Sequence, residues 1–334
     1  MRIAVALFLA CLACAQSWNS QTSGTTSSLR GVSAVSDTAA WASGAGGVWL
    51  STSDGGATWA VGKVPGAESL DFRGVRAIDP QTVYLVSSGP GDKSRIYKTT
   101  ESGAHWTLQF TNPDPKGFFD AIAFWDANHG MVLGDPVDGQ FAIWTTDDGG
   151  AHWLRRHTPA AVANEGAFAA SNSCLFLMGK REAWFGTGGT SCARVYHSKN
   201  RGRSWTVAPT PIRHDSASAG IFSLAFSDSR RGIAVGGDYA KDREDRQNIA
   251  ITADGGRTWS VPPGPVPKGF RSAVVHMRDR KIWLATGTSG SDYSMDSGKT
   301  WKAFDGGSYN AMSFAADAGW AVGARGHIAS FRMN

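Results

Sequence analysis

The stretch Thr52-Ser53-Asp54-Gly55-Gly56-Ala57-Thr58-Trp59 decides the fold, because its pattern, S/T-x-D-x-G-x-T-W, occurs six times along the chain. The glycine and the tryptophan never vary, and the acidic slot of the six copies holds Asp54, Glu101, Asp148, Asn200, Asp254 and Asp296. An aspartate or asparagine can fold a turn by bonding to nearby backbone, and glycine supplies a positive φ. The tryptophan buries a large ring between neighbouring units. We therefore interpret the acidic residues as structural parts of a hairpin, not as catalytic groups.

The spacing of the repeat predicts the architecture. Successive tryptophans lie 47, 47, 52, 54 and 42 residues apart, the size of a propeller blade of four short strands. A seventh unit, residues 309–331, has three strands and no box, and residues 17–22 could supply its fourth strand. This closure would remove the open edges of the ring. We expect an all-β, seven-bladed β-propeller whose last blade is completed by the N-terminal strand; six blades is the alternative.

The N-terminus is typical of a secretory signal. Arg2 precedes an apolar run from Ile3 to Ala13, and Ala13-Cys14-Ala15 matches a cleavage site. We expect a signal peptide at 1–15, a single propeller domain at 16–334, and a secreted or periplasmic protein. A lipidated Cys11 or Cys14 is an alternative, although neither has a leucine three residues before it.

The patterns of cysteine, histidine and glycine residues limit which disulfide, metal and cofactor sites we expect. Only Cys174 and Cys192 remain after cleavage, and an oxidising compartment permits a disulfide between them, which the sequence leaves open. The spacing of the cysteines and of the eight histidines suggests no metal site. No dinucleotide-binding glycine motif opens a helix. We expect no cofactor, no metal and a monomeric protein.

Polar residues recur at equivalent positions near the starts of the first strands, on the face that we call the top. Together with polar residues of nearby loops they should ring the mouth of the central channel, the usual binding site of a propeller. The candidate ligand-binding residues are Arg30, Arg73, Asp120, Asp135, Glu165, Asp238, Tyr239 and Arg271. The alternative is that these arginines and acids pair with one another and line a wet channel.

The opposite face, the bottom, has a one-sided distribution of charge. The turns of blades four to six are basic, whereas those of blades one to three carry aspartates, although the net charge is only +5. Such a basic sector can attract an acidic partner or a membrane surface, or it is simply a solvated surface. Its candidate partner-binding residues are Arg201, Arg203, Arg230, Arg231, Arg278 and Arg280. Nucleic acid is not expected, because aromatic residues do not interleave with these arginines.

The repeats resemble the BNR or Asp-box propellers, which include sialidases. The blade length and the T-x-D-G-G-x-T-W form are more similar to the photosystem II stability/assembly factor-like family of seven-bladed propellers, over essentially the whole mature chain. The resemblance implies a non-catalytic assembly factor that docks on a membrane protein, with an arginine-rich face as part of its action. It does not say whether photosynthesis is involved.

Two functions therefore compete. The first is a protein-binding scaffold for an envelope or membrane complex, with peripheral membrane contact as an option. The second is a glycoside hydrolase at the top mouth. A sialidase-like site would combine Arg30, Arg73 and Arg271 with Glu165 and either Tyr239 or Tyr309, whereas a two-carboxylate site would draw on Asp120, Asp135, Glu165 and Asp238.

Overall fold

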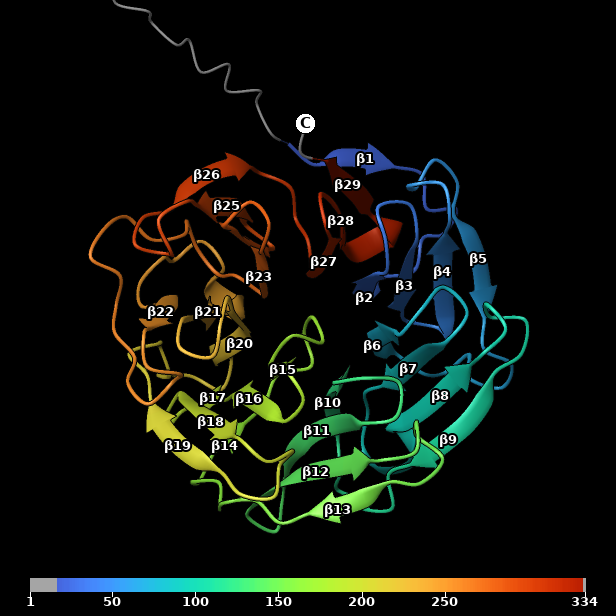
Figure 1. Cartoon of the computed structure of the whole chain (residues 1–334), viewed down its shortest axis with the longest axis horizontal. Helices are drawn as coiled ribbons and strands as arrows, with labels where there is room; N and C mark the ends of the chain where they lie inside the picture. The colour runs from blue at the N-terminus through green and yellow to red at the C-terminus, as the bar shows by residue number, and fades with distance from the viewer. Residues whose placement is uncertain (1–16, 333–334) are drawn as a thin grey trace, which may run out of the picture.

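The repeated hairpins build seven antiparallel sheets around a central axis, as the computed structural model shows (Figure 1). It describes residues 17–332, so the predicted signal peptide at 1–15 lies outside the described residues. Each sheet is one blade, and the strands that begin at residues 29, 72, 119, 175, 219, 273 and 311 lie innermost, beside the channel (Figure 1). The prediction of an all-β, seven-bladed propeller is confirmed.

The first three blades follow the chain without interruption, and each has four strands in the order of the sequence. Blade one contains β2 (Leu29–Ala34), β3 (Ala40–Gly44), β4 (Val48–Thr52) and β5 (Ala60–Lys63). Blade two contains β6 (Phe72–Ala77), β7 (Val83–Ser87), β8 (Arg95–Thr99) and β9 (Thr107–Thr111). Blade three contains β10 (Phe119–Phe124), β11 (Gly130–Val137), β12 (Gln140–Thr146) and β13 (Leu154–Arg156).

Blades four to six contain two short additional strands, β14 (Glu165–Gly166) and β17 (Gly188–Gly189), which extend the blade-five sheet. Blade four contains β15 (Leu175–Met178), β16 (Glu182–Gly186), β18 (Arg194–Ser198) and β19 (Thr206–Pro209). Blade five contains β20 (Ala219–Phe226), β21 (Gly232–Asp238) and β22 (Ile249–Thr252). Blade six contains β23 (Ala273–Met277), β24 (Ile282–Gly287), β25 (Gly290–Ser294) and β26 (Lys302–Asp305).

The seventh blade joins the two ends of the chain. It contains β27 (Ala311–Ala315), β28 (Ala318–Val322) and β29 (Ile328–Arg332), and its outer strand is β1 (Asn19–Gln21). Asn19 lies opposite Ser330 and Gln21 opposite Ile328 in an antiparallel register. Because β1 takes up the free edge of β29, the last blade has four strands like its neighbours.

Three short 3-10 helices, η1 (Gly91–Lys93), η2 (Tyr239–Lys241) and η3 (Ala324–Gly326), lie in loops. Within residues 17–332 no helix has the length and apolar character needed to cross a membrane.

The core lies between adjacent blades. One cluster joins Leu50 and Trp59 of blade one to Trp320 and Ile328 of blade seven. Another joins Tyr84 of blade two to blade three, where its ring stacks on Phe124 at 4.2 Å between centroids. Each blade therefore buries its apolar faces against its neighbours, and these interfaces contribute much of the stability of the ring.

The acidic residues of the boxes hold their own turns. In the first box, Asp54 accepts hydrogen bonds from the backbone N–H of Thr58 at 3.0 Å and from the hydroxyls of Thr58 and Thr52 at 2.6 and 2.8 Å. Gly56 has a φ of 85°, and its N–H donates to the Thr52 hydroxyl at 2.9 Å. Asp148, Asn200, Asp254 and Asp296 repeat this arrangement.

The fifth box gives a prediction for acid stability. Burial would raise the pKa of Asp254, but hydrogen bonds from Thr258 and Thr252 outweigh it and lower the pKa to about 2. A depressed folded-state pKa contributes stability above the ordinary value of 3.8, and this contribution is lost as the pH falls toward about 2. We expect Asp254→Asn to flatten the pH dependence of the unfolding free energy between pH 4 and pH 2 (about the window of these two values), because an amide does not titrate there.

Asn200 provides the natural precedent for this variant. Its side chain accepts from the Ser204 N–H at 2.9 Å and donates to the Ser204 hydroxyl at 2.8 Å, so an amide can hold the turn. Denaturant unfolding of both proteins across this pH window checks the prediction, and parallel pH profiles would contradict it.

Candidate functional site

A cavity of about 460 Å³ opens at the top end of the central channel. We call it the top cavity. Five of the eight predicted ligand-binding residues line it, on blades one, two, three and five: Arg30, Arg73, Asp120, Asp135 and Tyr239. Its remaining lining residues include Phe118, Phe168, Phe222, Phe270, Ser272, Thr288 and Asn310. Its volume falls in the range of about 300–1,000 Å³ typical of small-ligand sites.

Two arginines give the blade-one and blade-two side of the cavity a positive charge. Arg73 pairs through its Nε with Asp71 at 2.7 Å, and its guanidinium lies 6.0 Å from the centre of the Phe118 ring. The Nε of Arg30 is buried and has no hydrogen-bond partner among residues 17–332. Burial and the nearby charge of Arg73 lower the pKa of Arg30, against the opposing effect of Asp71.

Two carboxyl groups lie next to these arginines. Asp120 is 1% exposed, and its Oδ2 has no hydrogen-bond partner within the described chain. Burial raises the pKa of Asp120 well above its usual value, the charge of Asp135 adds to this, and Arg73 opposes it. Burial also raises the pKa of Asp135, whose Oδ1 accepts from the Ala167 N–H at 2.9 Å. Both shifts make protonation of the carboxyl easier, and a protonated carboxyl donates a hydrogen bond.

Aromatic rings form the side of the cavity nearest blades five and six. Phe168 stacks on Phe222 with centroids 3.9 Å apart, and Phe270 meets Phe222 edge-on at 4.7 Å. Tyr239 lies at the rim, 6.0 Å from Phe222. The Phe168 ring can approach this closely because Gly220 beneath it has no side chain, and a Cβ there would lie 2.7 Å from the ring.

The segment 167–173 crosses the central channel, and we call it the plug. Figure 1 shows a loop beside β15 that reaches into the centre of the ring. Asn172 accepts from the Ile122 N–H at 2.8 Å and donates to the carbonyls of Ile122 and Val75 at 3.0 and 3.3 Å. On the other side, Ser171 donates to the Ser272 carbonyl at 2.6 Å, and the Ser173 hydroxyl donates to Ser223 at 2.7 Å.

The plug divides the channel into two cavities. Its residues 167–170 line the top cavity, whereas 171–173 line a second cavity of about 350 Å³ that opens at the bottom. Phe124, Phe226, Phe314 and Arg278 are among the residues around this second cavity. The plug was not predicted from the sequence. The available signal was the interval of 52 residues between Trp153 and Trp205, longer than the two intervals of 47 before it.

The hydrogen bonds of Asn172 give a prediction for the plug. Asn172 has a φ of 63°, so a glycine there keeps the backbone conformation and removes only the side chain. We expect Asn172→Gly to lower the unfolding free energy by about 1–3 kcal/mol, because the buried Ile122 and Val75 groups lose their partner. Asn164, exposed and with a φ of 60°, gives the matched control Asn164→Gly. Equal stabilities of the two variants would contradict the prediction.

Glu165 and Asp238 do not line the top cavity. Glu165 is buried and forms an ion pair with Arg194, and it accepts from the Thr187 hydroxyl at 2.6 Å. Burial would raise the pKa of Glu165, but these hydrogen bonds outweigh it and lower the pKa. Asp238 accepts from Ser218 at 2.7 Å, from Ser216 at 3.0 Å and from the Ala240 N–H at 3.0 Å. Both carboxylates thus hold loops in place.

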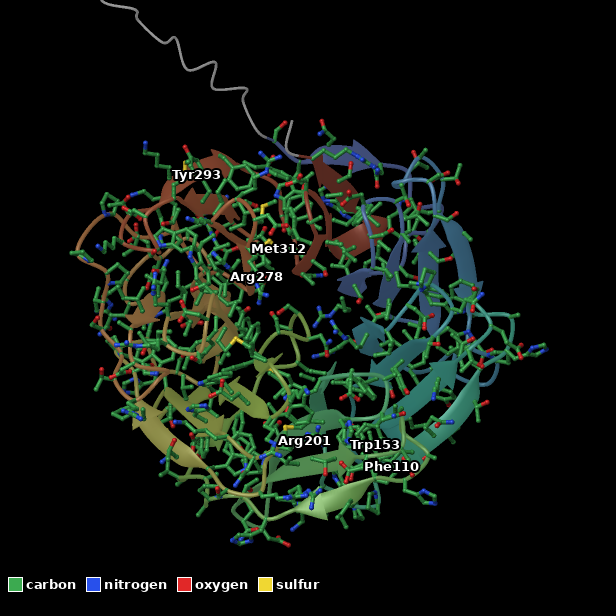
Figure 2. The ribbon with its side chains drawn as sticks, in the orientation of Figure 1. Phe110, Trp153, Arg201, Arg278, Tyr293 and Met312 are labelled. Atoms are coloured by element: carbon green, nitrogen blue, oxygen red, sulfur yellow. The ribbon has the colours of Figure 1, made fainter. Side chains whose placement is uncertain are left out.

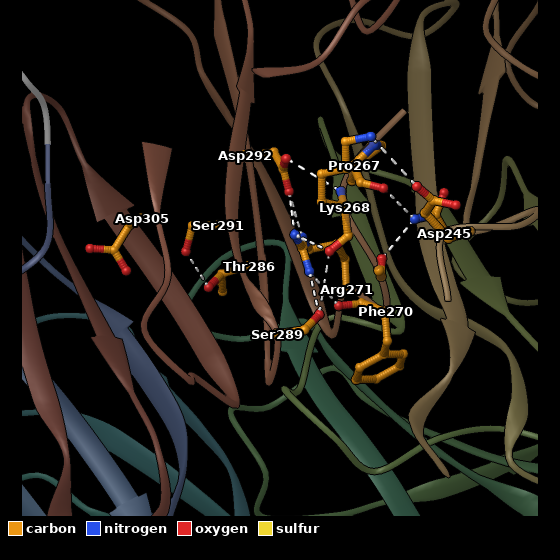
Figure 3. Close-up of polar contacts among 12 residues, drawn as sticks. Asp245, Pro267, Lys268, Phe270, Arg271, Thr286, Ser289, Ser291, Asp292 and Asp305 are labelled. Atoms are coloured by element: carbon orange, nitrogen blue, oxygen red, sulfur yellow. Dashed lines mark hydrogen bonds and ion pairs between the residues drawn. The ribbon is translucent and has the colours of Figure 1, made fainter. Parts of the chain in front are cut away.

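Arg271 is also turned away from the top cavity and buried, with 1% of its surface exposed. It forms an ion pair with Asp292, whose Oδ2 accepts from the Arg271 Nε at 2.7 Å (Figure 3). It also donates to the Phe270 and Lys268 carbonyls at 2.7 and 2.9 Å and to the Ser289 hydroxyl at 3.0 Å (Figure 3). Arg30, Arg73 and Arg271 therefore do not converge on one ligand.

The six bottom arginines lie in the turns β18–β19, β20–β21 and β23–β24, in different settings. Arg231 pairs with Asp228 at 3.4 Å and Arg280 with Asp317 at 2.9 Å, so these two charges are partly balanced. Arg201 donates to the Lys180 carbonyl at 2.8 Å and lies over the Trp125 ring. Arg203, Arg230 and Arg278 are exposed. In Figure 2, Arg278 lies beside the central opening and Arg201 farther out, so the sector is spread over several blades.

The disulfide that the sequence left open is absent, since Cys174 and Cys192 are both free thiols. Cys174 directly precedes β15, the inner strand of blade four, whereas Cys192 lies two residues before the start of β18, the third strand. One strand, β16, separates β15 from β18. Two strand spacings amount to about 9.6 Å, beyond the roughly 7 Å that a disulfide can bridge between Cα atoms.

Comparison with known proteins finds no matching family model and no matching curated protein. Among solved structures, YCF48 bound to D1 peptide aligns with a TM-score of 0.69 and 17% identity, over 95% of this chain and 97% of that chain. YCF48 from Cyanidioschyzon merolae aligns with a TM-score of 0.60 and 16% identity, over 94% and 98% of the two chains. U3-55K aligns with a TM-score of 0.65 and 14% identity, over 96% and 99%.

These likenesses establish the fold. The resemblance to the photosystem II assembly factor-like propellers is thereby confirmed at the level of architecture. At 14–17% identity the comparison assigns no ligand to this propeller, so its chemistry must come from its own residues.

The top cavity is suited to binding more than to hydrolysis. A glycosidase with two carboxyl groups uses one as a proton donor and keeps the other ionised. Here burial raises the pKa of both carboxyls that face the cavity, Asp120 and Asp135. Tyr309, one of the two candidate nucleophiles, is buried away from the cavity. Within residues 17–332 no group of three or more His, Cys, Asp or Glu side chains could hold a metal ion.

Proposed function

We propose that this propeller is a non-catalytic scaffold that binds a protein or peptide segment at its top cavity. The observation that carries the proposal is the composition of that cavity. Arg30 and Arg73 line the cavity on the side of blades one and two, and the stack of Phe168 on Phe222 lines the opposite side. Two buried polar atoms of the cavity, Arg30 Nε and Asp120 Oδ2, have no hydrogen-bond partner among residues 17–332. A concave, largely apolar site with a few placed polar groups is the usual form of a binding site.

The nature of the partner is part of the same proposal. The structurally similar YCF48 has been solved with a bound D1 peptide, which supports a peptide as the class of ligand. The signal-like residues 1–15 favour a secreted or periplasmic location. We therefore propose a monomeric assembly factor for an envelope or membrane complex. Exposed bottom arginines such as Arg230 and Arg278 offer a second contact to an acidic partner or a membrane surface.

The test is capture of partners from a solubilised native envelope on the immobilised protein. The top variant is Tyr239→Ala, which removes a rim side chain that is 56% exposed, so folding should be unaffected. The matched control is Val261→Ala, 51% exposed and outside the cavity. The bottom variant is Arg230→Glu with Arg278→Glu.

The proposal expects a partner that is retained by wild type, by the Val261→Ala control and by the bottom variant, and is lost from Tyr239→Ala. A partner lost only from the bottom variant would move the binding site to the basic sector. Turnover of glycosides by wild type would overturn the non-catalytic scaffold and restore the hydrolase.

A further inference from the structure

The top cavity contains one arginine, Arg30, that forms no ion pair among residues 17–332. The Asp71 carboxylate pairs with Arg73, whereas the buried Nε of Arg30 has no partner among residues 17–332. Burial raises the pKa of the two carboxyls that line the cavity, Asp120 and Asp135. A charged guanidinium with a buried nitrogen that has no hydrogen-bond partner costs free energy unless a ligand supplies the partner. The ligand would therefore carry the negative charge that pairs with Arg30.

The charge and the surroundings narrow the class of anion. One unbalanced positive charge matches a monoanion, and the planar guanidinium fork matches the two oxygens of a carboxylate. Asp120 lines the same cavity, and its buried Oδ2 has no hydrogen-bond partner among residues 17–332, so a protonated Asp120 carboxyl can donate one more hydrogen bond. A dianionic phosphate would exceed the available charge.

The aromatic side of the cavity favours a ligand with an apolar group. The stack of Phe168 on Phe222, with Phe270 edge-on, presents ring surface to the same space as the arginines. Aromatic rings gain free energy from further ring or alkyl contact. We infer that the top cavity recognises the carboxylate of an apolar acid, held by the Arg30 and Arg73 guanidinium groups with its apolar body against Phe168, Phe222 and Phe270. This inference rests on the proposed function and names the chemical group that the site recognises.

Calorimetric titration of the purified protein tests the inference. The probes are 4-phenylbutyrate and its neutral amide, and a short peptide ending in phenylalanine with a free or an amidated C-terminus. Each acid should bind at least about tenfold more tightly than its amide, because a carboxylate forms charge-assisted hydrogen bonds with a guanidinium and a neutral amide does not. If the free-acid peptide binds more tightly than phenylbutyrate, the ligand is a chain end; the reverse order indicates a small acid.

Arg30→Met should weaken binding of the acids about tenfold or more and leave the amides unchanged. Arg203→Met, which replaces an exposed arginine on the bottom face, should change the affinity for neither the acids nor the amides. The comparison of acid with amide on wild type needs no variant, so a folding defect in Arg30→Met does not obscure the result. Equal binding of acid and amide, or no binding of either acid, overturns the inference. A partner captured through Tyr239 would still stand in that case, so the two proposals fail separately.

Discussion

Trp18→Ala is expected to lower the unfolding free energy by about 3–5 kcal/mol, the usual cost of removing a large buried aromatic side chain. Trp18 is 6% exposed and directly precedes β1. Its ring lies 5.4 Å from Tyr309, 5.9 Å from Phe314 and 5.5 Å from Phe331, between centroids. Its Nε1 donates to the Ser291 hydroxyl of blade six at 3.0 Å.

The loss should lie toward the upper end of this range, because Trp18 directly precedes the strand that completes blade seven and anchors it. Without it, β1 is less firmly held and the edge of β29 becomes available to other chains. Urea unfolding of the purified proteins measures the loss. Met295→Ala, at a residue that is 70% exposed, should stay within about 0.5 kcal/mol of wild type. A loss below about 1 kcal/mol for Trp18→Ala would show that β1 contributes little to closure.

Asp292→Ala is expected to cost about 3–5 kcal/mol, because it leaves the Arg271 guanidinium buried without a counter-charge. Both side chains are 1% exposed. The carbonyls of Phe270 and Lys268 and the Ser289 hydroxyl still accept from Arg271, but they carry no net charge. Equilibrium unfolding in denaturant measures the change.

The double variant Arg271→Met Asp292→Leu separates charge from packing. Removing both charges of a buried pair is often neutral or stabilising, so most of the lost stability should return. The exposed pair Arg280–Asp317 serves as the comparison, and Asp317→Ala should leave stability unchanged within measurement error. If the double variant is as unstable as Asp292→Ala, the pair acts through its shape and hydrogen bonds instead of its charge.

The blades were predictable because their signals are local. The glycine and tryptophan of each box lie within a few residues of the acid that holds the turn, so one stretch such as Thr52–Trp59 contains the whole hairpin. Arg30, Arg73 and Asp120 were predictable for a similar reason, since each follows the start of an inner strand at an equivalent position.

The remaining site residues depend on partners that are distant in the sequence. Arg271 occupies the position of Leu29, one residue before that of Arg30, because the backbone N–H groups of Arg271 and Leu29 bond to the equivalent carbonyls of the preceding blades, Gly236 and Gly323. Its side chain therefore lies in the interior, where it pairs with Asp292 of the following hairpin. No sequence feature near Arg271 predicts its ion pair with Asp292. The plug consists of alanine and small polar residues with one phenylalanine, Phe168, and has no alternating pattern. Its partners Val75, Ile122, Ser223 and Ser272 come from four different blades. Such contacts follow from the closed ring and not from local pattern.

The plug prevents the central channel from acting as a passage through the protein. Many ring-shaped folds enclose a passage, but here residues 167–173 separate the upper compartment from the lower one. A solute that enters at the top must leave by the opening through which it came. Different molecules can occupy the two compartments at the same time. The seven residues 167–173 form the wall between them, with Phe168 facing the upper compartment and Asn172 the lower one. A shift of Phe168 would therefore move the same stretch of backbone that the hydrogen bonds of Asn172 hold in place.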